Sequence, residues 1–325
     1  PRHEDFVPED DAVIGVVFWW SLLVVGIVAG IALLLMLLFL GRGDETETII
    51  TKQVEAPEAL VPDLSVLPDV RFTDITTDAG IDFVHESGAQ GEKYLPETMG
   101  SGAAFLDMDR DGDQDLLLVN AMSWAHSKAP DRPADVMALY ANDGTGRFTN
   151  VTEGSGLDSP MYGTGVAVGD VDADGLPDVF IAGLGRNRLY RNLGQGRFLD
   201  VSTKAGIEGE NETWSTSPAF FDMEGDGDLD LFIANYVDWS AEKDSELNFT
   251  LNGQDRAYGP PIQYGGSQPY LYRNRGDGTF EDVSEAAGMH VQNASTGVPV
   301  GKSLAVAPID LDRDGVCRRY IANMR

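Results

Sequence analysis

The first pattern along the chain is a long apolar run. Residues 13–40 carry no charged side chain, and at 1.5 Å per residue such a helix crosses a hydrocarbon core of about 30 Å with some tilt. A cleaved signal peptide is the competing interpretation. Its apolar region would span only about 7 to 15 residues, and no small-x-small cleavage site follows here. The sequence therefore predicts a retained transmembrane helix over 13–40, preceded by a short tail over 1–12.

Residues 41–69 are polar and contain prolines, without helical or alternating periodicity. We interpret them as a linker between the helix and a second domain. The tripeptide Arg42-Gly43-Asp44 recurs at Arg275-Gly276-Asp277. We interpret the first copy as part of the linker and the second as a repeat turn, rather than as integrin ligands.

Two short patterns alternate over residues 70–325, and such repetition is informative before any single element. A glycine turn precedes a strand-like segment in GTGRFTNVTEGSGL, GQGRFLDVSTKAGI and GDGTFEDVSEAAGM, with RFTDITTDAGI as a leading half copy. An acidic loop between apolar runs occurs in AAFLDMDRDGDQDLLLVN, VAVGDVDADGLPDVFIAG, AFFDMEGDGDLDLFIAN and AVAPIDLDRDGVCRRYIAN. Between the two patterns lie the motifs LYAN, LYRN and LYRN.

Each unit thus supplies about four short apolar strands separated by Gly, Asp and Asn turns. Four strands per repeated unit are typical of a β-propeller blade. A stack or sandwich is the alternative, which the unit length disfavours. We expect an all-β fold over 70–325, a β-propeller of about four repeats with the last incomplete, preceded by one transmembrane α-helix.

The acidic loops have the spacing of a calcium site. Carboxylates at positions 1, 3, 5 and 9 surround a glycine at position 6, and the carbonyl of position 7 adds an oxygen, which suits the six to eight oxygens that Ca²⁺ prefers. Polar turns alone would also be rich in Asp and Gly, but three complete copies favour the ion. Packed carboxylates repel one another, so we expect the metal to stabilise the fold.

The predicted metal ligands fall in four loops, the fourth of which has Arg318 at its ninth position. They are Asp107, Asp109, Asp111, Asp113 and Asp115; Asp170, Asp172, Asp174, Leu176 and Asp178; Asp222, Glu224, Asp226, Asp228 and Asp230; and Asp310, Asp312 and Asp314.

Charge and composition narrow the function classes. The formal net charge is −30, which argues against nucleic acid as a partner because a phosphate backbone attracts clustered cations. The single cysteine, Cys317, excludes an internal disulfide framework, and the four histidines lack zinc-site spacing.

The sequence resembles the FG-GAP/VCBS repeat proteins, in particular the cartilage acidic protein type often found with an ASPIC/UnbV domain. FVHESG, YLPETMGSGAAFLDMDRDGDQDLLLVN and YGPPIQYGGSQPYLYRNRGDGTFEDVSEAAGM carry the resemblance, together with the acidic loops. It covers roughly residues 70–323 and implies an integrin-α-like propeller that holds Ca²⁺ in its blade loops. Relatives of this type usually continue through more blades, and the last segment here, GVCRRYIANMR, departs from the pattern.

The leading functional hypothesis is a non-catalytic scaffold in a larger membrane complex, such as a respiratory or photosynthetic one. The helix, with the small-residue spacing Gly26-xxx-Gly30, would contact other membrane subunits and the lipid bilayer. Loops of this kind suit compartments rich in Ca²⁺, so we expect a single-pass protein of the cell or inner membrane, with a cytoplasmic N-terminus and a periplasmic or extracellular propeller.

Two alternatives stay open. An adhesion or ligand-recognition receptor would use the insertions at 121–137 and 237–268, with Trp124, His126 and Trp239 as candidates. A carbohydrate-active enzyme would use acidic pairs, with His85 and Tyr94 as further candidates. Because the carboxylates are committed to the metal loops, we assign no catalytic residues and no organic cofactor.

Overall fold

The computed structural model describes residues 12–40, 71–124, 137–309 and 318–323. The chain divides into two compact units, residues 1–71 and residues 72–325, and each is described by itself.

The first unit contains helix α1 (Ala12–Leu40), which begins one residue before the predicted span. Its window Trp19–Met36 has a mean hydropathy of 2.4 and is exposed throughout. The helix is long and apolar enough to cross a membrane, and a signal sequence near the N-terminus would meet the same criteria.

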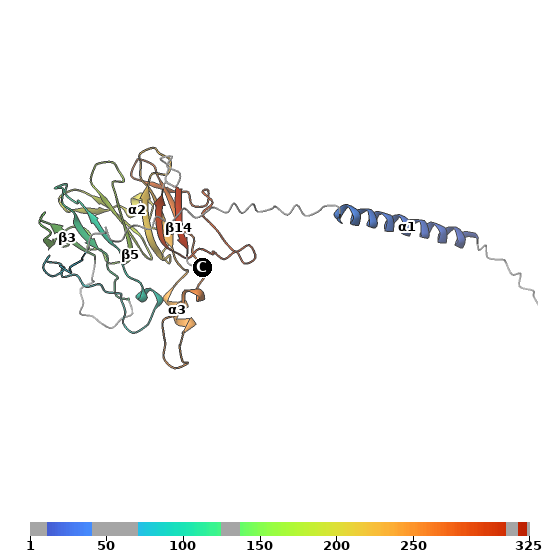
Figure 1. The fold of residues 1–325 in the computed structure, drawn as a ribbon, viewed down its shortest axis with the longest axis horizontal. Helices are drawn as coiled ribbons and strands as arrows, with labels where there is room; N and C mark the ends of the chain where they lie inside the picture. Colours follow the sequence, from blue (N-terminus) through green and yellow to red (C-terminus); the bar gives the residue numbers. More distant parts are fainter. Residues whose placement is uncertain (1–11, 41–70, 125–136, 310–317, 324–325) are drawn as a thin grey trace, which may run out of the picture. The chain divides into compact units, whose positions relative to one another are not determined.

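The second unit is built from three four-stranded antiparallel sheets and a two-stranded one (Figure 1). The strands of the first two sheets are β1 (Ala103–Leu106), β2 (Asp115–Leu118), β3 (Ala138–Asn142) and β4 (Phe148–Asn150), then β5 (Tyr162–Gly169), β6 (Asp178–Leu184), β7 (Arg188–Asn192) and β8 (Phe198–Asp200). The remaining strands are β9 (Ser215–Phe221), β10 (Asp230–Asn235), β11 (Tyr270–Asn274), β12 (Phe280–Asp282), β13 (Ser303–Ile309) and β14 (Arg318–Asn323). The expectation of four strands per repeat is confirmed for three repeats.

Short helices lie in the connections between strands. They are η2 (Leu95–Thr98), α2 (Ser202–Ala205), α3 (Ala241–Leu247) and η3 (Pro261–Gln263). The Ser240 hydroxyl caps α3 by accepting from the Lys243 amide at 3.2 Å, which satisfies one of the free N–H groups at a helix start.

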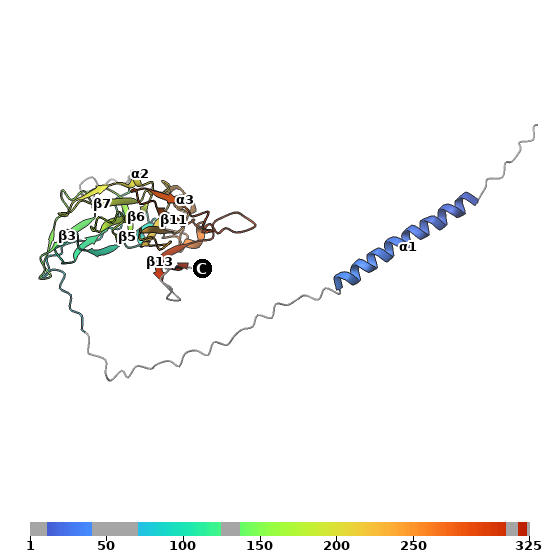
Figure 2. The same cartoon turned by 90° about the horizontal axis from the view of Figure 1, so that it is seen from above.

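Within each sheet the strands follow chain order, as Figure 2 shows for β5, β6 and β7. The second strands are apolar and buried on both faces, because they lie between neighbouring blades: β10 reads DLFIAN and is buried at every position. The first strands of successive blades contact one another in the order β1, β5, β9 and β13. This arrangement is a β-propeller whose blades meet along their first strands.

Glycine allows the first strands to approach closely. A Cβ placed on Gly165 of β5 would lie 1.9 Å from the carbonyl oxygen of Thr216 in β9, and one on Gly102 would lie 2.9 Å from the amide nitrogen of Val166. There is no room for a side chain at these two positions.

Hydroxyl groups tie the same seams together. Ser101 Oγ donates to the Gly163 carbonyl at 2.9 Å, Thr164 Oγ1 to the Ser215 carbonyl at 2.6 Å, and Thr216 Oγ1 to the Ser303 carbonyl at 2.9 Å. Each of the first three blades therefore donates one side-chain hydrogen bond to the first strand of the next blade. This repeated link is not visible in the alternation of apolar residues.

The leading half copy over 71–81 is used as a blade connection rather than as a strand. Its Ala79 carbonyl accepts from the Phe148 amide at 2.7 Å, just as the Ser155 carbonyl accepts from the Phe198 amide at 2.6 Å in the next blade. A Cβ on Gly80 would collide with the carbonyl oxygen of Phe148, and one on Gly156 with that of Phe198. The half copy therefore supports the outer strand of the first sheet.

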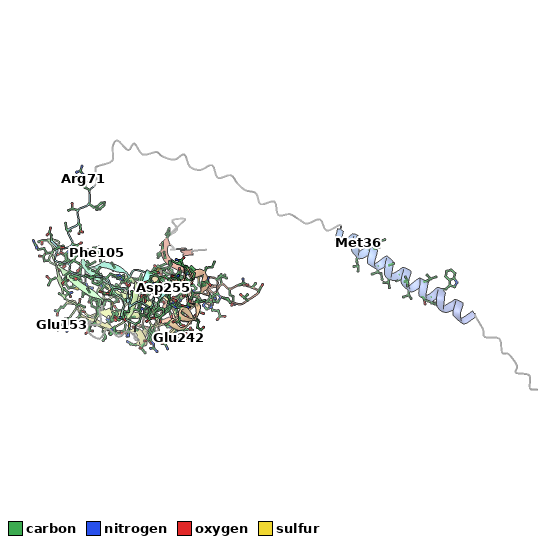
Figure 3. All side chains as sticks on the ribbon, turned by 90° about the horizontal axis from the view of Figure 1, so that it is seen from below. Met36, Arg71, Phe105, Glu153, Glu242 and Asp255 are labelled. Carbon is green, nitrogen blue, oxygen red and sulfur yellow. The ribbon has the colours of Figure 1, made fainter. Side chains whose placement is uncertain are left out.

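The first strands of the terminal blades each expose one face. On β1 Phe105 is 62% exposed, and on β13 Ile309 is 43% exposed, with alternate residues of both strands facing out. Figure 3 labels Phe105 among the side chains of this unit. By contrast, no residue of β5 or β9 is exposed.

Candidate functional site

The acidic loops connect the first and second strands of each blade, as predicted. In an antiparallel sheet, alternate connections lie at opposite ends of the strands. The acidic loops and the glycine turns between third and fourth strands therefore share one end of the propeller. The glycine turns do lie against the acidic loops of their blades. A Cβ added to Gly144 would lie 2.5 Å from a carboxylate oxygen of Asp113, and one added to Gly276 would lie 3.0 Å from a carboxylate oxygen of Asp228.

The first carboxylate of each loop fixes the loop backbone. Asp107 accepts from the amides of Asp111 and Gly112, both at 3.1 Å, and Asp170 and Asp222 make the equivalent bonds in their loops. The glycines at position 6, Gly112, Gly175 and Gly227, have φ values of 93°, 83° and 95°, which glycine tolerates without steric cost. The loops are thus shaped by their own hydrogen bonds.

The ninth carboxylate has a structural role that the sequence pattern did not reveal. Asp178 is fully buried and accepts from the Val171 amide at 3.0 Å and the Asn192 amide at 2.8 Å. Asp115 and Asp230 accept equivalent bonds in their blades. This residue therefore joins the loop to the third strand, whatever else it binds.

Burial opposes ionisation of the ninth carboxylate in the first and second loops. It raises the pKa of Asp178 to about 6, with Asp172 and Asp174 adding repulsion, and it also raises the pKa of Asp115. A divalent cation beside such a cluster would favour the ionised form.

The first and second loops each bring three carboxylates together. Oxygens of Asp107, Asp109 and Asp115 lie within 4.8 Å of one another, as do those of Asp170, Asp172 and Asp174. Oxygen donors at this spacing fit a hard cation such as Ca²⁺. Among the described residues, the third loop forms no such group. The predicted ligands of the fourth loop, Asp310, Asp312 and Asp314, lie outside the described residues.

The variable residue of the LYxN motif distinguishes the loops. Arg191 contacts Asp172 at 2.5 Å and Asp174 at 3.2 Å, and Arg273 lies 3.9 Å from Glu224. The first blade has Ala141 at this position. Arg191 places a guanidinium where a bound ion would need the same carboxylates, so the first loop offers the less obstructed cation site.

We therefore expect Arg191→Ala to strengthen calcium binding at the second loop by about tenfold. The variant removes a competing cation from Asp172 and Asp174, and one tenfold step corresponds to about 1.4 kcal/mol. Isothermal titration of the chelated chain with Ca²⁺ measures the change. Arg188→Ala is the control, because Arg188 pairs with Asp200 at 2.6 Å outside the loop. If both variants bound Ca²⁺ with the affinity of the parent, Arg191 would not compete with the ion.

The opposite end of the propeller carries an aromatic cluster. Trp124 stacks on Tyr162 with ring centroids 4.7 Å apart, lies 5.6 Å from Trp239, and meets the edge of Tyr94 at 5.3 Å. The insertions after the second strands of the first and third blades thus bring Trp124 and Trp239 together. His126 lies outside the described residues. His85 bonds Ser101 Oγ at 3.1 Å.

Two buried carboxylates, which sequence reasoning missed, fix the two indoles. Glu97 accepts from Trp124 Nε1 at 2.9 Å and from the Tyr258 hydroxyl at 3.2 Å. Asp244 accepts from Trp239 Nε1 at 2.6 Å and pairs with Arg256 at 2.5 Å. Glu97 lies in η2 and Asp244 in α3, and no sequence pattern marks either carboxylate as buried.

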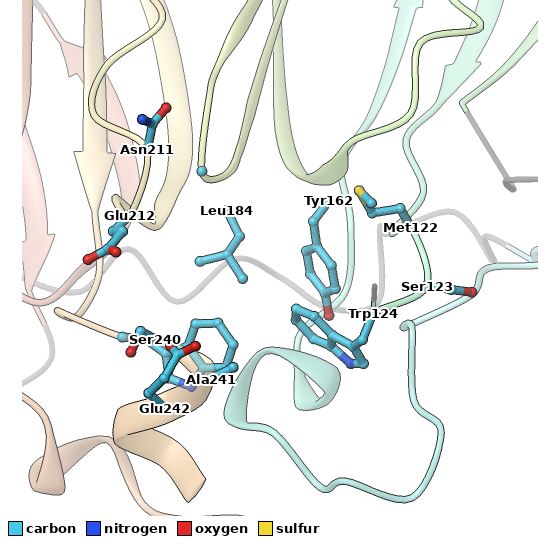
Figure 4. Close-up of a pocket in the computed structure, with 12 residues that line it drawn as sticks. Met122, Ser123, Trp124, Tyr162, Leu184, Asn211, Glu212, Ser240, Ala241 and Glu242 are labelled. Atoms are coloured by element: carbon cyan, nitrogen blue, oxygen red, sulfur yellow. The ribbon is translucent and has the colours of Figure 1, made fainter. Parts of the chain in front are cut away.

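A cavity of about 300 Å³ adjoins this cluster (Figure 4). Leu184 points into the space between Tyr162 and the start of α3. The exposed side chains at its rim are Ser123, Asn211, Glu212 and Glu242.

Three successive four-stranded sheets, each with an acidic loop between its first two strands, define a repeat protein of the β-propeller class. A family model described as FG-GAP-like repeat matches residues 107–181 and 170–233, which include the first three acidic loops. Residues 107–233 of the chain are FG-GAP-like repeats.

Curated relatives agree with this assignment. Cartilage acidic protein 1 of Xenopus tropicalis is 24% identical over 277 residues, covering 68% of this chain and 39% of that protein. The human protein of the same name is 30% identical over 130 residues, covering 38% of this chain and 18% of the relative. The chain thus spans about two fifths or less of these relatives.

Solved structures also match. One of them concerns recognition of non-reducing terminal N-acetylglucosamine by an Agrocybe aegerita lectin, with 18% identity, a TM-score of 0.35, and coverage of 66% of this chain and 44% of that one. A TM-score this low supports no argument about fold or ligand.

Proposed function

We propose that the protein is a non-enzymatic, membrane-anchored interaction module that stabilises a larger membrane protein complex. In this proposal α1 is a membrane span and the propeller lies on the periplasmic or extracellular side, where Ca²⁺ occupies the acidic loops. The carrying observation is the division of the propeller into two ends. One end bears the repeated acidic loops, and the other bears the long insertions that vary between blades.

The division supports an interaction role for a physical reason. Repeated loops that fix their own backbone stabilise the scaffold, whereas insertions confined to one end create a surface that differs from blade to blade. Segment 236–269 contributes α3, η3 and two side-chain partners of Asp244, Trp239 and Arg256, to that end. Function is commonly carried by such loops on a rigid scaffold.

Copurification from native membranes tests this function. We expect the chain, extracted in mild detergent with Ca²⁺, to migrate with other membrane subunits in fixed stoichiometry on size exclusion. We expect chelation, which weakens the propeller, to reduce the association. A monomeric chain under both conditions would contradict the scaffold role.

A ligand-recognition receptor is the second candidate, and the cavity beside Trp124 and Trp239 favours it. A recognition receptor would be recovered as a monomer. After chelation it would keep its ligand only if the loops at the insertion end kept their structure.

A further inference from the structure

The cavity at the insertion end has a rigid aromatic wall. The Trp124 and Trp239 indoles are fixed through their N–H groups by Glu97 and Asp244, and the Tyr162 hydroxyl donates to the Ser87 carbonyl at 2.7 Å. Tyr162 and Trp239 are each 5% exposed. A wall held in this way loses little conformational entropy when a ligand binds.

The charge around the cavity has one sign. Among the described residues that line it, the charged ones are Glu212 and Glu242, and both are exposed. Arg186 donates to Asn211 on the rim at 2.7 Å, and its guanidinium is paired with Glu208 at 3.1 Å. The cavity therefore attracts cations and repels anions.

Aromatic faces and carboxylates together favour one ligand chemistry. The negative face of an aromatic ring attracts a cation, and methylated ammonium groups also gain from apolar contact. Leu184, Met122 and Ala241 supply apolar surface beside the rings. A volume of about 300 Å³ lies at the lower end of small-molecule sites.

We propose that this cavity binds a small organic cation that carries a quaternary or N-methylated ammonium group. Trp124, which is half-buried, offers most of the ring surface that contacts the methyl groups, and Tyr162 and Trp239 hold it in place. Glu212 and Glu242 at the rim neutralise the charge. This site goes beyond the interaction role, because it needs no partner protein and can exist whether or not the chain belongs to a complex.

Choline is the probe for this site, and 3,3-dimethylbutan-1-ol, which has the same shape without the charge, is its matched control. The full chain is placed in nanodiscs of phosphatidylglycerol at constant Ca²⁺, so that no lipid choline competes. Tryptophan fluorescence and calorimetry then follow each titration. We expect saturable choline binding at least about tenfold tighter than that of the neutral analogue, because the charge supplies the difference.

Two variants with three charge-removing substitutions locate the site. We expect the pair Glu212→Gln and Glu242→Gln, combined in one chain, to weaken choline binding by about tenfold. Glu246→Gln on the same helix α3 should leave it unchanged, because Glu246 lines a different cavity. All three positions are exposed, so the fold is expected to persist, and circular dichroism checks it.

Each outcome decides the proposal. Equal binding of the neutral analogue, tighter binding of a neutral sugar such as N-acetylglucosamine, unchanged binding in the double variant, or no choline binding at millimolar concentration would overturn it. If the chain did not copurify with other membrane subunits but still bound choline, the result would count against the scaffold function alone.

Discussion

Replacing Gly165 with alanine should destabilise the propeller by about 3 kcal/mol or more, at the upper end of the usual cost of overpacking. The new methyl group would lie 1.9 Å from the Thr216 carbonyl oxygen and 2.9 Å from Pro218 Cδ. Backbone on the neighbouring strand cannot rotate away as a side chain can. The blades must therefore separate at the seam between β5 and β9, which also breaks the bond from Thr164 to Ser215.

Thermal and denaturant unfolding of the full chain in detergent with Ca²⁺ measures this loss. Gly100→Ala is the matched control, because a Cβ at Gly100 meets nothing within 4 Å and its φ is not in the left-handed region. We expect that variant to keep the parent stability within about 0.5 kcal/mol. Similar unfolding of both variants would show that the first strands do not meet as described.

The second large effect is expected from Asp244→Ala, which should cost about 3 to 5 kcal/mol. Asp244 is 3% exposed and accepts from Leu95, Trp239 and Arg256. Removing one partner of a buried ion pair leaves the other charge uncompensated. The variant also frees the Trp239 indole, so the near-ultraviolet circular dichroism of the aromatic cluster should weaken.

Asp238→Ala in the same insertion is the control. Asp238 pairs with Lys243 at 2.5 Å, but both side chains are about half exposed, and surface ion pairs contribute about 0 to 1 kcal/mol. Denaturant midpoints of the two variants at pH 7 give the comparison. A loss in Asp244→Ala no larger than in Asp238→Ala would contradict the buried role.

Local pattern was enough to predict the repeats. The acidic loop and the two flanking apolar runs lie within about twenty residues of one another, and a hairpin depends mainly on neighbours along the chain. The apolar helix over 13–40 was predicted for a similar reason, since its length and lack of charge are properties of the segment itself.

The insertions could not be predicted in this way. Glu97 and Trp124 are separated in sequence but joined by a hydrogen bond, and Leu95 meets Asp244 across the domain. A buried carboxylate in a short connecting helix has the same sequence appearance as an exposed one. Its burial depends on how the first and third blades are placed.

The metal loops fall between these cases. Their spacing alone predicted Asp107, Asp109 and Asp115 as a group, which the structure brings together. Arg191, which pairs with the second-loop carboxylates, comes from the third strand of the blade. Its effect on Asp172 and Asp174 therefore appears only when that strand is folded beside the loop.

By itself, the sequence determined the repeat unit, its strand-forming segments, the acidic loops and the apolar helix, because each depends on residues close together along the chain. The tertiary structure alone decided which strands meet at the glycine seams, which loop carboxylates meet an arginine, and which distant side chains form the aromatic cavity. Those features depend on distances between separate blades, and no local pattern of residues specifies them.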